Sequence, residues 1–381
     1  MTQPLDGIFV LDFTTLLPGP LATLMLSESG ASVMKIEHPR GEEMRAMGPF
    51  VEGESAPFSL LNRGKMSLEL DLKNPVDLAK LRPYLENADV LVEQFRPGVM
   101  ERFGLSYEAV RAINPRLVYC SITGYGQTGP RAGEAGHDLN YIGATGLLAL
   151  APGPADAPTV PPALIADIGG GTFPAVINIL LALRQRDATG EGCHLDIAMS
   201  DGMFTFAWLG LAAGFATGRY PGASELPVTG ALARYHLYPT QDGRLVACAA
   251  LEQKFWLAFV AAISLPKPFV NDLRDPAAAK KAVGDIIATR TADEWRPIFA
   301  KADCCVTVVA SLEEAVCDPH FVQRGLFADQ IVALHGMKFS ALPLPVAREF
   351  RRAEGHVDVW PHLGLTDEGR PFTFLTKPPP A

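Results

Sequence analysis

Short apolar runs alternate with stretches of helical periodicity over the first half of the chain. Residues 8–13 (IFVLDF) are apolar, residues 21–30 (LATLMLSESG) follow helical spacing and end in a glycine, and residues 31–37 (ASVMKIE) are apolar again. Apolar runs and helical stretches continue to alternate beyond residue 126. This strand, helix, strand order is typical of a parallel α/β unit. We therefore predict a doubly wound parallel sheet over about residues 1–200.

The pattern changes near residue 225. Residues 233–250 (ARYHLYPTQDGRLVACAA) predict a hairpin around Gln241-Asp242-Gly243, and helical patterns then dominate to about residue 320. We predict four parts along the chain: a large domain over 1–200, a linker helix over 201–224, a small domain over 225–325, and a C-terminal segment over 326–381 that returns to the large domain.

Charge and composition narrow the function classes. The 381 residues carry a net charge of −9, which argues against a nucleic-acid partner because phosphate binding requires a surplus of Lys and Arg. No run of 18 uncharged apolar residues and no signal-peptide pattern is present, so we expect no membrane segment and a cytoplasmic location. The six cysteines show neither a CxxC pair nor a His at metal-ligand spacing. We expect no metal and no disulfide.

Ligands of doubly wound sheets bind at the carboxyl ends of the strands, so the loops after Phe13, Glu37, Phe95 and Ile122 are the expected binding loops. The chain has no GxGxxG motif that opens a helix after the first strand, no phosphate-binding GxxxxGK[ST] loop and no GxSxG elbow. Nicotinamide, nucleoside-triphosphate and serine-hydrolase chemistry thus lack their usual signatures.

Two glycine-bordered segments hold titratable residues. His137 lies in residues 122–141 (ITGYGQTGPRAGEAGHDLNY), and Asp167 lies in residues 166–172 (ADIGGGT). Glu252 opens an amphipathic helix after the predicted hairpin. Two bases on opposite sides of a carbon can exchange its proton, and a further carboxylate can fix a histidine tautomer. The residues predict an α/β enzyme with an acid/base pair, although a glycine-rich segment also occurs where a helix packs closely against a sheet.

The whole chain resembles the class III coenzyme A-transferase family, also called CaiB/BaiF. The likeness is dense in the first half and is carried by residues 5–39, 61–73, 90–110 and 122–130. Three more segments resemble the α-methylacyl-CoA racemase branch: GHDLNY at 136–141, ADIGGG at 166–171 and ALEQKF at 250–255. In that branch a His, an Asp and a Glu form the reaction centre, and the matching residues here are His137, Asp167 and Glu252.

The resemblance implies a Rossmann-like large domain, a smaller α+β domain, and an interlocked homodimer in which the partner chain supplies Glu252. It implies an acyl-CoA substrate and no required cofactor. The phosphates of coenzyme A need nearby cations, and polar groups of the protein are needed to hold the rest of the ligand and its enolate oxygen. The candidates are Arg96, Arg63, Lys65, Lys35, Gly136 and Asp138 for coenzyme A, and Gly169, Gly170 and Gly171 as amide donors to the oxygen.

Three functions remain open. In a racemase of 2-methylacyl-CoA thioesters, His137 and Asp167 would exchange the proton next to the thioester. In a CoA-transferase, Asp167 would instead attack the thioester to form a mixed anhydride. A non-catalytic acyl-CoA-binding protein is the third. Two departures from the racemase pattern are His38, where relatives have Arg, and LEQKF at 251–255, where a proline is usual.

Overall fold

The computed structural model describes residues 3–151, 153–154, 156–333, 335–351 and 357–359. The chain divides into two units. The first comprises the described residues up to Ile142, the segment Ala163–Met203 and the described residues from Pro319 onward; the second comprises Gly143–Pro162 and Phe204–Asp318.

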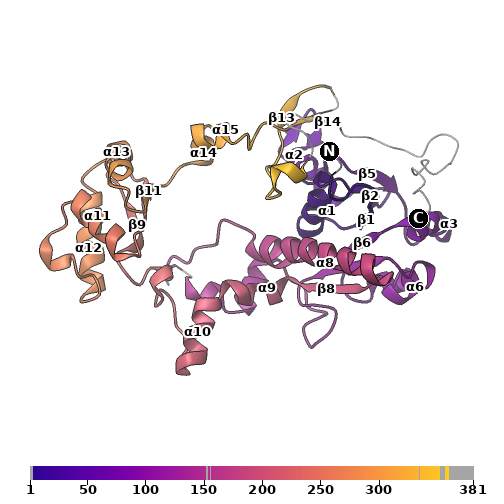
Figure 1. Cartoon of the computed structure of the whole chain (residues 1–381), viewed down its shortest axis with the longest axis horizontal. Helices are drawn as coiled ribbons and strands as arrows, with labels where there is room; N and C mark the ends of the chain where they lie inside the picture. The colour runs from indigo at the N-terminus through magenta and orange to yellow at the C-terminus, as the bar shows by residue number, and fades with distance from the viewer. Residues whose placement is uncertain (1–2, 152, 155, 334, 352–356, 360–381) are drawn as a thin grey trace. The chain divides into compact units, whose positions relative to one another are not determined.

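A six-stranded sheet forms the centre of the first unit (Figure 1). All neighbouring strands are parallel, in the spatial order β5-β2-β1-β6-β7-β8. The predicted α/β class with a Rossmann-like parallel sheet is confirmed. The chain order reverses between β1 and β6, and ligands of such sheets bind at the carboxyl ends of the strands beside this reversal. The strands are β1 (Phe9–Phe13), β2 (Ser32–Glu37), β5 (Met66–Glu69), β6 (Val90–Glu93), β7 (Val118–Thr123) and β8 (His194–Ala198).

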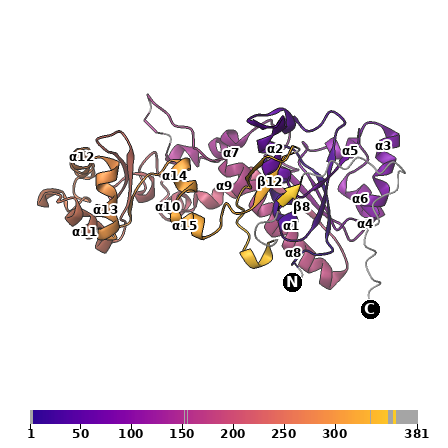
Figure 2. The ribbon, with the colours of Figure 1, turned by 90° about the horizontal axis from the view of Figure 1, so that it is seen from above.

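Helices cover both faces of this sheet (Figure 2). Helices α1 (Pro18–Glu28) and α8 (Phe173–Thr189) pack on one face, and α4 (Arg82–Asn87) and α6 (Tyr107–Ile113) lie on the other. Every residue of β1, β6 and β7 is therefore buried. This double burial explains why the strands read as continuous apolar runs in the sequence.

Helix α1 is the central helix of the first unit, because all of its residues are buried. It packs against α8, against α2 (Ala56–Asn62) and against a π-helical segment, η3 (Ala166–Thr172). The other elements that lie wholly or mostly in the first unit before Phe204 are short: η1 (Glu43–Ala46), α3 (Pro75–Lys80), α5 (Val99–Arg102), α7 (Asp138–Ala144), α9 (Met199–Phe206), β3 (Phe50–Val51) and β4 (Glu54–Ser55).

By length and composition alone, the helical stretch Ala166–Thr189 would be able to cross a membrane. In this structure it packs on β7, β8 and α1, and its residue Arg186 pairs with the buried Asp89 at 2.8 Å. Core helices have the same composition, so the stretch is weak evidence for a membrane segment.

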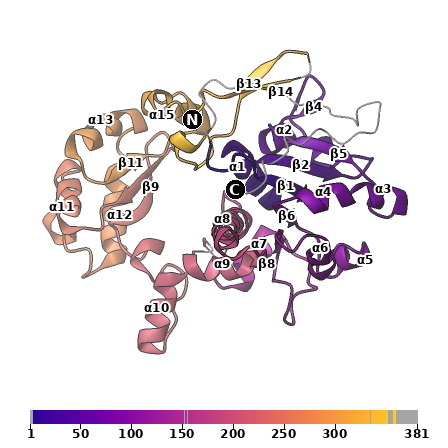
Figure 3. The ribbon, with the colours of Figure 1, turned by 45° about the vertical axis from the view of Figure 1, so that its right-hand side comes forward.

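The second unit is built on a three-stranded antiparallel sheet, in the order β11-β10-β9 (Figure 3). Its core contains Trp256, Phe259 and Trp295. The predicted hairpin is confirmed, since Pro239 pairs with Leu245 across the turn. The elements are β9 (Tyr235–Pro239), β10 (Leu245–Ala249), β11 (Val306–Val308), α10 (Trp208–Thr217), α11 (Gln253–Ala262), α12 (Pro276–Ile287), α13 (Ala292–Ala302) and α14 (Leu312–Val316).

The described C-terminal residues belong to the first unit again. They form α15 (Pro319–Gln323) and a small sheet of β12 (Gln330–Val332), β13 (Lys338–Ser340) and β14 (Val357–Val359). The unit bounds differ from the predicted domains, because the second unit begins at Phe204 and also includes Gly143–Pro162. The single linker helix predicted over 201–224 is wrong: α9 ends at Phe206, and α10 ends at Thr217 before a left-handed glycine.

Candidate active site

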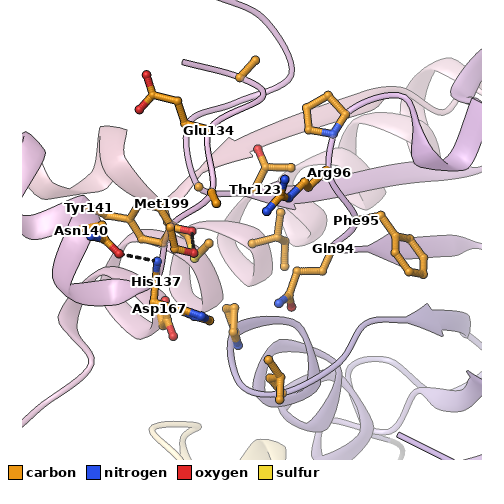
Figure 4. Close-up of a pocket in the computed structure, with 18 residues that line it drawn as sticks. Gln94, Phe95, Arg96, Thr123, Glu134, His137, Asn140, Tyr141, Asp167 and Met199 are labelled. Atoms are coloured by element: carbon orange, nitrogen blue, oxygen red, sulfur yellow. Dashed lines mark hydrogen bonds between the residues drawn. The ribbon is translucent and has the colours of Figure 1, made fainter. Parts of the chain in front are cut away.

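A cavity of about 420 Å³ opens at the carboxyl ends of β1, β6 and β7, beside the reversal of strand order (Figure 4). Three of the four predicted binding loops contribute to it. The lining residues are Leu16, Pro18, Gln94, Phe95, Arg96, Pro97, Ile122, Thr123, Gly124, Ala132, Glu134, Ala135, Gly136, His137, Asn140, Tyr141, Asp167 and Met199. His137 and Asp167 therefore line the same cavity, as the sequence predicted.

His137 stands immediately before α7, and that helix fixes its backbone. The His137 N–H donates to Oδ1 of Asn140 at 3.0 Å, while the His137 carbonyl accepts from the N–H of Asn140. Its side chain is exposed. The preceding Gly136 also lines the cavity, and a Cβ at Gly136 would lie 2.6 Å from the ring of Tyr141. Gly136 is thus required for close packing beside the histidine.

Asp167 lies in the first turn of η3 and is half-buried. Its pKa is raised to about 6, first by burial and then by the negative charge of Asp138, while His137 acts in the opposite direction. Because the pKa is near neutrality, both the carboxylic acid and the carboxylate of Asp167 are accessible at physiological pH.

Asp138 connects the two predicted catalytic segments. Its buried Oδ1 accepts hydrogen bonds from the N–H groups of Ala166 at 2.6 Å and Asp167 at 3.0 Å. The carboxylate is turned into the protein and caps η3, and Asp138 is not among the described residues that line the cavity, so its predicted contact with coenzyme A stays a prediction. Through these two hydrogen bonds, Asp138 connects the first residue of α7 to the first two residues of η3.

Two glycines of η3, Gly170 and Gly171, serve packing. A Cβ at Gly170 would lie 2.1 Å from the carbonyl oxygen of Met199, and one at Gly171 would lie 3.0 Å from the Met199 side chain. Gly169, Gly170 and Gly171 are absent from the cavity lining in the part of the chain that the structure describes. The observed geometry explains the glycines by close contact between η3 and α9, and the predicted amide donation to an enolate oxygen stays a prediction.

Of the four predicted phosphate-binding cations, Arg96 lines the cavity and the other three are buried. Lys65 contacts Asp12 at 3.1 Å and also donates to Asn62 and to the carbonyl of Pro20. Its ammonium group, with three donors, has no hydrogen left for a ligand. The prediction for Lys65 is wrong, because it neutralises a carboxylate inside the fold.

Arg63 is corrected for the same reason, whereas the prediction for Lys35 stays a prediction. Lys35 pairs with Glu42 at 2.6 Å and donates to the carbonyl of Thr14. Arg63 pairs with Glu28 at 3.1 Å and donates to the carbonyl of Leu342 at 2.9 Å. Both cations stabilise the first unit from within, although Lys35 also lines a second cavity.

Glu252 lies in the second unit, directly before α11. Its side chain is exposed and makes no capping hydrogen bond to that helix. Within the single chain, the cavity that contains His137 and Asp167 is lined by residues of the first unit.

A second cavity of about 600 Å³ lies at the carboxyl ends of β1, β2 and β5, and Phe95 lines both cavities. Its wall includes four basic residues, Lys35, His38, Arg40 and Lys73, and the apolar side chains Leu72 and Phe103. Of these four, Lys35 and His38 were noted in the sequence. Arg40 could have been found from the sequence, because it lies in the loop after Glu37 that was predicted to bind a ligand. Lys73 likewise follows the end of a strand, β5, on this edge of the sheet.

A model of CoA-transferase family III matches residues 5–364. The chain belongs to this family. It is 34% identical to an α-methylacyl-CoA racemase of Homo sapiens over 85% of this chain and 82% of the relative. It is 35% identical to an acetyl-CoA:oxalate CoA-transferase of Acetobacter aceti over 85% of both chains.

Among solved structures, the chain is similar to a CAIB/BAIF family protein from Brucella suis, with 30% identity, a TM-score of 0.78, and coverage of 91% of this chain and 93% of the other. Racemases and CoA-transferases of family III are thus similar to this chain to about the same degree. Membership supports an acyl-CoA-dependent enzyme, and the choice between the two reactions depends on the site. Among the described residues, no group of three or more His, Cys, Asp or Glu side chains is placed to hold a metal ion.

Proposed function

We propose that the protein is a racemase of 2-methylacyl-CoA thioesters. The observation that carries this proposal is the pairing of His137 with Asp167 in one cavity, where the Asp167 pKa of about 6 makes both of its protonation states available. A two-base proton exchange needs one group in its basic form and the other in its acidic form at the same time.

In the proposed reaction, the imidazole of His137 takes the proton from the carbon next to the thioester, and the electron pair of the C–H bond moves into an enolate. The carboxylic acid of Asp167 then gives its proton to the opposite face of that carbon. For the other epimer the two residues exchange roles. Asp138 holds the backbone of Asp167 and disfavours its ionisation, so it acts as a positioning residue.

The second cavity is the proposed place of the nucleotide part of coenzyme A. Arg40 and Lys73 are exposed at its wall, and Phe95 and Phe103 offer aromatic surface to a base. Phe95 lines both cavities, so a ligand that passes this ring would reach the cavity of His137. Arg96, in the adjacent turn, is the proposed partner of a negatively charged group.

A homodimer is also part of the proposal. Helix α8 exposes an apolar stripe on the single chain, in which Ile177 is 56% and Leu181 is 63% exposed. Phe173 and Leu180 extend the stripe. A stripe of this kind on a helix of the first unit favours burial by a second copy. We expect the partner chain to supply Glu252 to the site, as the resemblance to the racemases implies.

The alternative reaction, CoA transfer, uses Asp167 differently. Its carboxylate would attack the thioester carbonyl and break the C–S bond, which gives an aspartyl-acyl anhydride and the coenzyme A thiolate. The thiolate would then attack the aspartyl carbonyl, which releases the first acid and leaves a thioester on Asp167. The carboxylate of the second acid would displace the thiolate to form a new anhydride, and the thiolate would attack the acyl carbonyl of that anhydride to give the new thioester and free Asp167. The similarity to an oxalate CoA-transferase favours this alternative. The presence of His137 in the cavity favours the racemase, because acyl transfer through Asp167 does not require it.

One experiment separates the two reactions. The purified enzyme is incubated in deuterated water with (2R)-2-methylacyl-CoA, with and without a free carboxylic acid. Deuterium at the α carbon together with the 2S epimer, in the absence of the acid, supports the racemase. Turnover only with the acid, with formation of its CoA thioester, supports the transferase and overturns the proposal. An enzyme that catalyses neither reaction in any arm would favour the non-catalytic binding protein.

A further inference from the structure

Thr123 is the last residue of β7, and its hydroxyl group has no hydrogen-bond partner among the described residues. The residue is 6% exposed and lines the cavity of His137 and Asp167. Its Oγ1 is buried and makes no hydrogen bond within the part of the chain that the structure describes. Buried hydroxyl groups are nearly always hydrogen-bonded, because leaving one unpaired costs free energy. An unpaired hydroxyl in a cavity wall therefore points to a bound ligand.

The nearest strand end carries a cation. Residues Glu93 and Ser121 are paired in the register of β6 and β7, so the turn after β6, which contains Arg96, begins next to Thr123. The guanidinium of Arg96 makes no hydrogen bond or ion pair among the described residues. Figure 4 shows Arg96 and Thr123 on the side of the cavity away from His137 and Asp167.

The same side of the cavity offers donors. The side-chain oxygen of Gln94 accepts from the N–H of Gly19 at 2.9 Å, which leaves the two amide hydrogens of Gln94 available as donors. The carboxylate on this wall, that of Glu134, is exposed and lies 3.8 Å from Arg131. A hydroxyl, an amide and a guanidinium together match an anionic oxygen, which accepts several hydrogen bonds.

We propose that Thr123 is a ligand-binding residue whose hydroxyl donates to an anionic oxygen of the acyl-CoA, the same group that Arg96 holds. This inference rests on the proposed acyl-CoA function. Two parts of the ligand can supply such an oxygen: a phosphate of coenzyme A, or a carboxylate at the far end of the acyl group. Thr123 would discriminate in favour of ligands that carry it.

Substitution by valine gives opposite signs in the free and the bound protein. Thr123→Val removes an unpaired buried hydroxyl and keeps the shape of the side chain, so the free protein should melt at the same or a higher temperature. The ligand loses one charge-assisted hydrogen bond, so its dissociation constant should rise about ten-fold. Thr123→Ser keeps the hydroxyl and is the matched control. A residue with a purely structural role would not separate these two effects.

The test is isothermal titration calorimetry of the full-length wild type, Thr123→Val and Thr123→Ser with three ligands: coenzyme A, butyryl-CoA and succinyl-CoA. The first has no acyl group, and the other two differ in a distal carboxylate. We expect Thr123→Val to weaken binding about ten-fold while Thr123→Ser stays within about two-fold of wild type. A loss with all three ligands places the oxygen on coenzyme A. A loss confined to succinyl-CoA places it on the acyl carboxylate.

Three results would overturn the inference. Equal affinities of wild type and Thr123→Val for every ligand mean that the hydroxyl contacts none of them. A loss with both thioesters and none with coenzyme A would place the hydroxyl on the thioester carbonyl and refute the anionic group. If the wild type binds none of the three ligands, the proposed acyl-CoA function fails together with the inference, whereas the first result leaves that function intact.

Discussion

Replacing Asp138 by Asn tests how the site keeps Asp167 partly protonated. The Asn side chain preserves the shape and the oxygen that accepts from the N–H groups of Ala166 and Asp167, and it removes the negative charge. That charge is the second cause of the raised Asp167 pKa, after burial. The substitution should therefore lower the pKa of Asp167.

The structure sets the size of the effect. The Asp167 pKa is raised from 3.8 to about 6. At pH 7 such a carboxyl is roughly 10% protonated, compared with about 0.1% at the ordinary pKa. Because burial remains in Asp138→Asn, we expect the pKa to fall by roughly half to one unit, which lowers the protonated fraction about three- to ten-fold.

The assay is the pH dependence of kcat/KM for α-deuterium exchange, measured for both epimers. Each epimer reacts with a form of the enzyme in which the pair of His137 and Asp167 carries one proton. Because both forms hold the same number of protons, the two epimers should show the same pH profile with two apparent pKa values. In Asp138→Asn the acid limb should move to lower pH. An unmoved limb, or one that moves to higher pH, would refute the reasoning.

A stability control distinguishes a loss of charge from a collapse of the site. Asp138→Ala removes both hydrogen bonds at the start of η3 and should lower the free energy of unfolding by roughly 2–4 kcal/mol. Asp138→Asn should change it by less than about 1 kcal/mol. Equal losses in urea titrations of the two variants would mean that the altered pH profile reports structural damage.

Three further variants probe the fold and the site. Lys65→Met leaves the buried carboxylate of Asp12 without its cation, so urea unfolding at pH 7 should show a loss of about 3–5 kcal/mol, and a loss below about 1 kcal/mol would contradict the burial argument. Asp167→Asn should raise the free energy of unfolding by ~1 kcal/mol at pH 8 and leave it unchanged near pH 3.5, because a carboxyl group whose pKa is raised in the folded protein lowers stability only at pH values above its pKa in the unfolded chain. A gain that does not depend on pH would refute this. Gly170→Ala places a Cβ 2.1 Å from a backbone carbonyl oxygen and should cost about 2 kcal/mol or more in thermal or urea unfolding, whereas Gly143→Ala, with open space, should be neutral; equal effects would contradict the packing role.

The sheet and the position of the site could be predicted because both depend on local patterns. Strands buried on both faces must be apolar along their whole length, which made β1, β6 and β7 visible in the sequence. The carboxyl ends of parallel strands lie at one edge, which predicted a cavity there, and the connection between β7 and β8 carries both His137 and Asp167 to it.

The roles of the lysines could not be predicted, because their partners are remote in sequence. Asp12 precedes Lys65 by 53 positions, and a lysine without a visible partner is expected to be exposed. The same holds for Asp138, whose contact with Asp167 spans 29 positions. The glycines of η3 looked like an anion-binding loop, and only the contact with Met199 shows why side chains are excluded there.

The central claim is that His137 and Asp167 act on opposite faces of one carbon. The most direct test is to measure exchange of the α proton for deuterium in variants that lack one of the two groups. His137→Ala and Asp167→Asn are each incubated in deuterated water with a pure epimer of 2-methylacyl-CoA, and deuterium and configuration are followed together. We predict that each variant exchanges the α proton of one epimer only, with retention, and that the two variants exchange opposite epimers. Inversion by either variant, or exchange of the same epimer by both, would contradict the two-face arrangement.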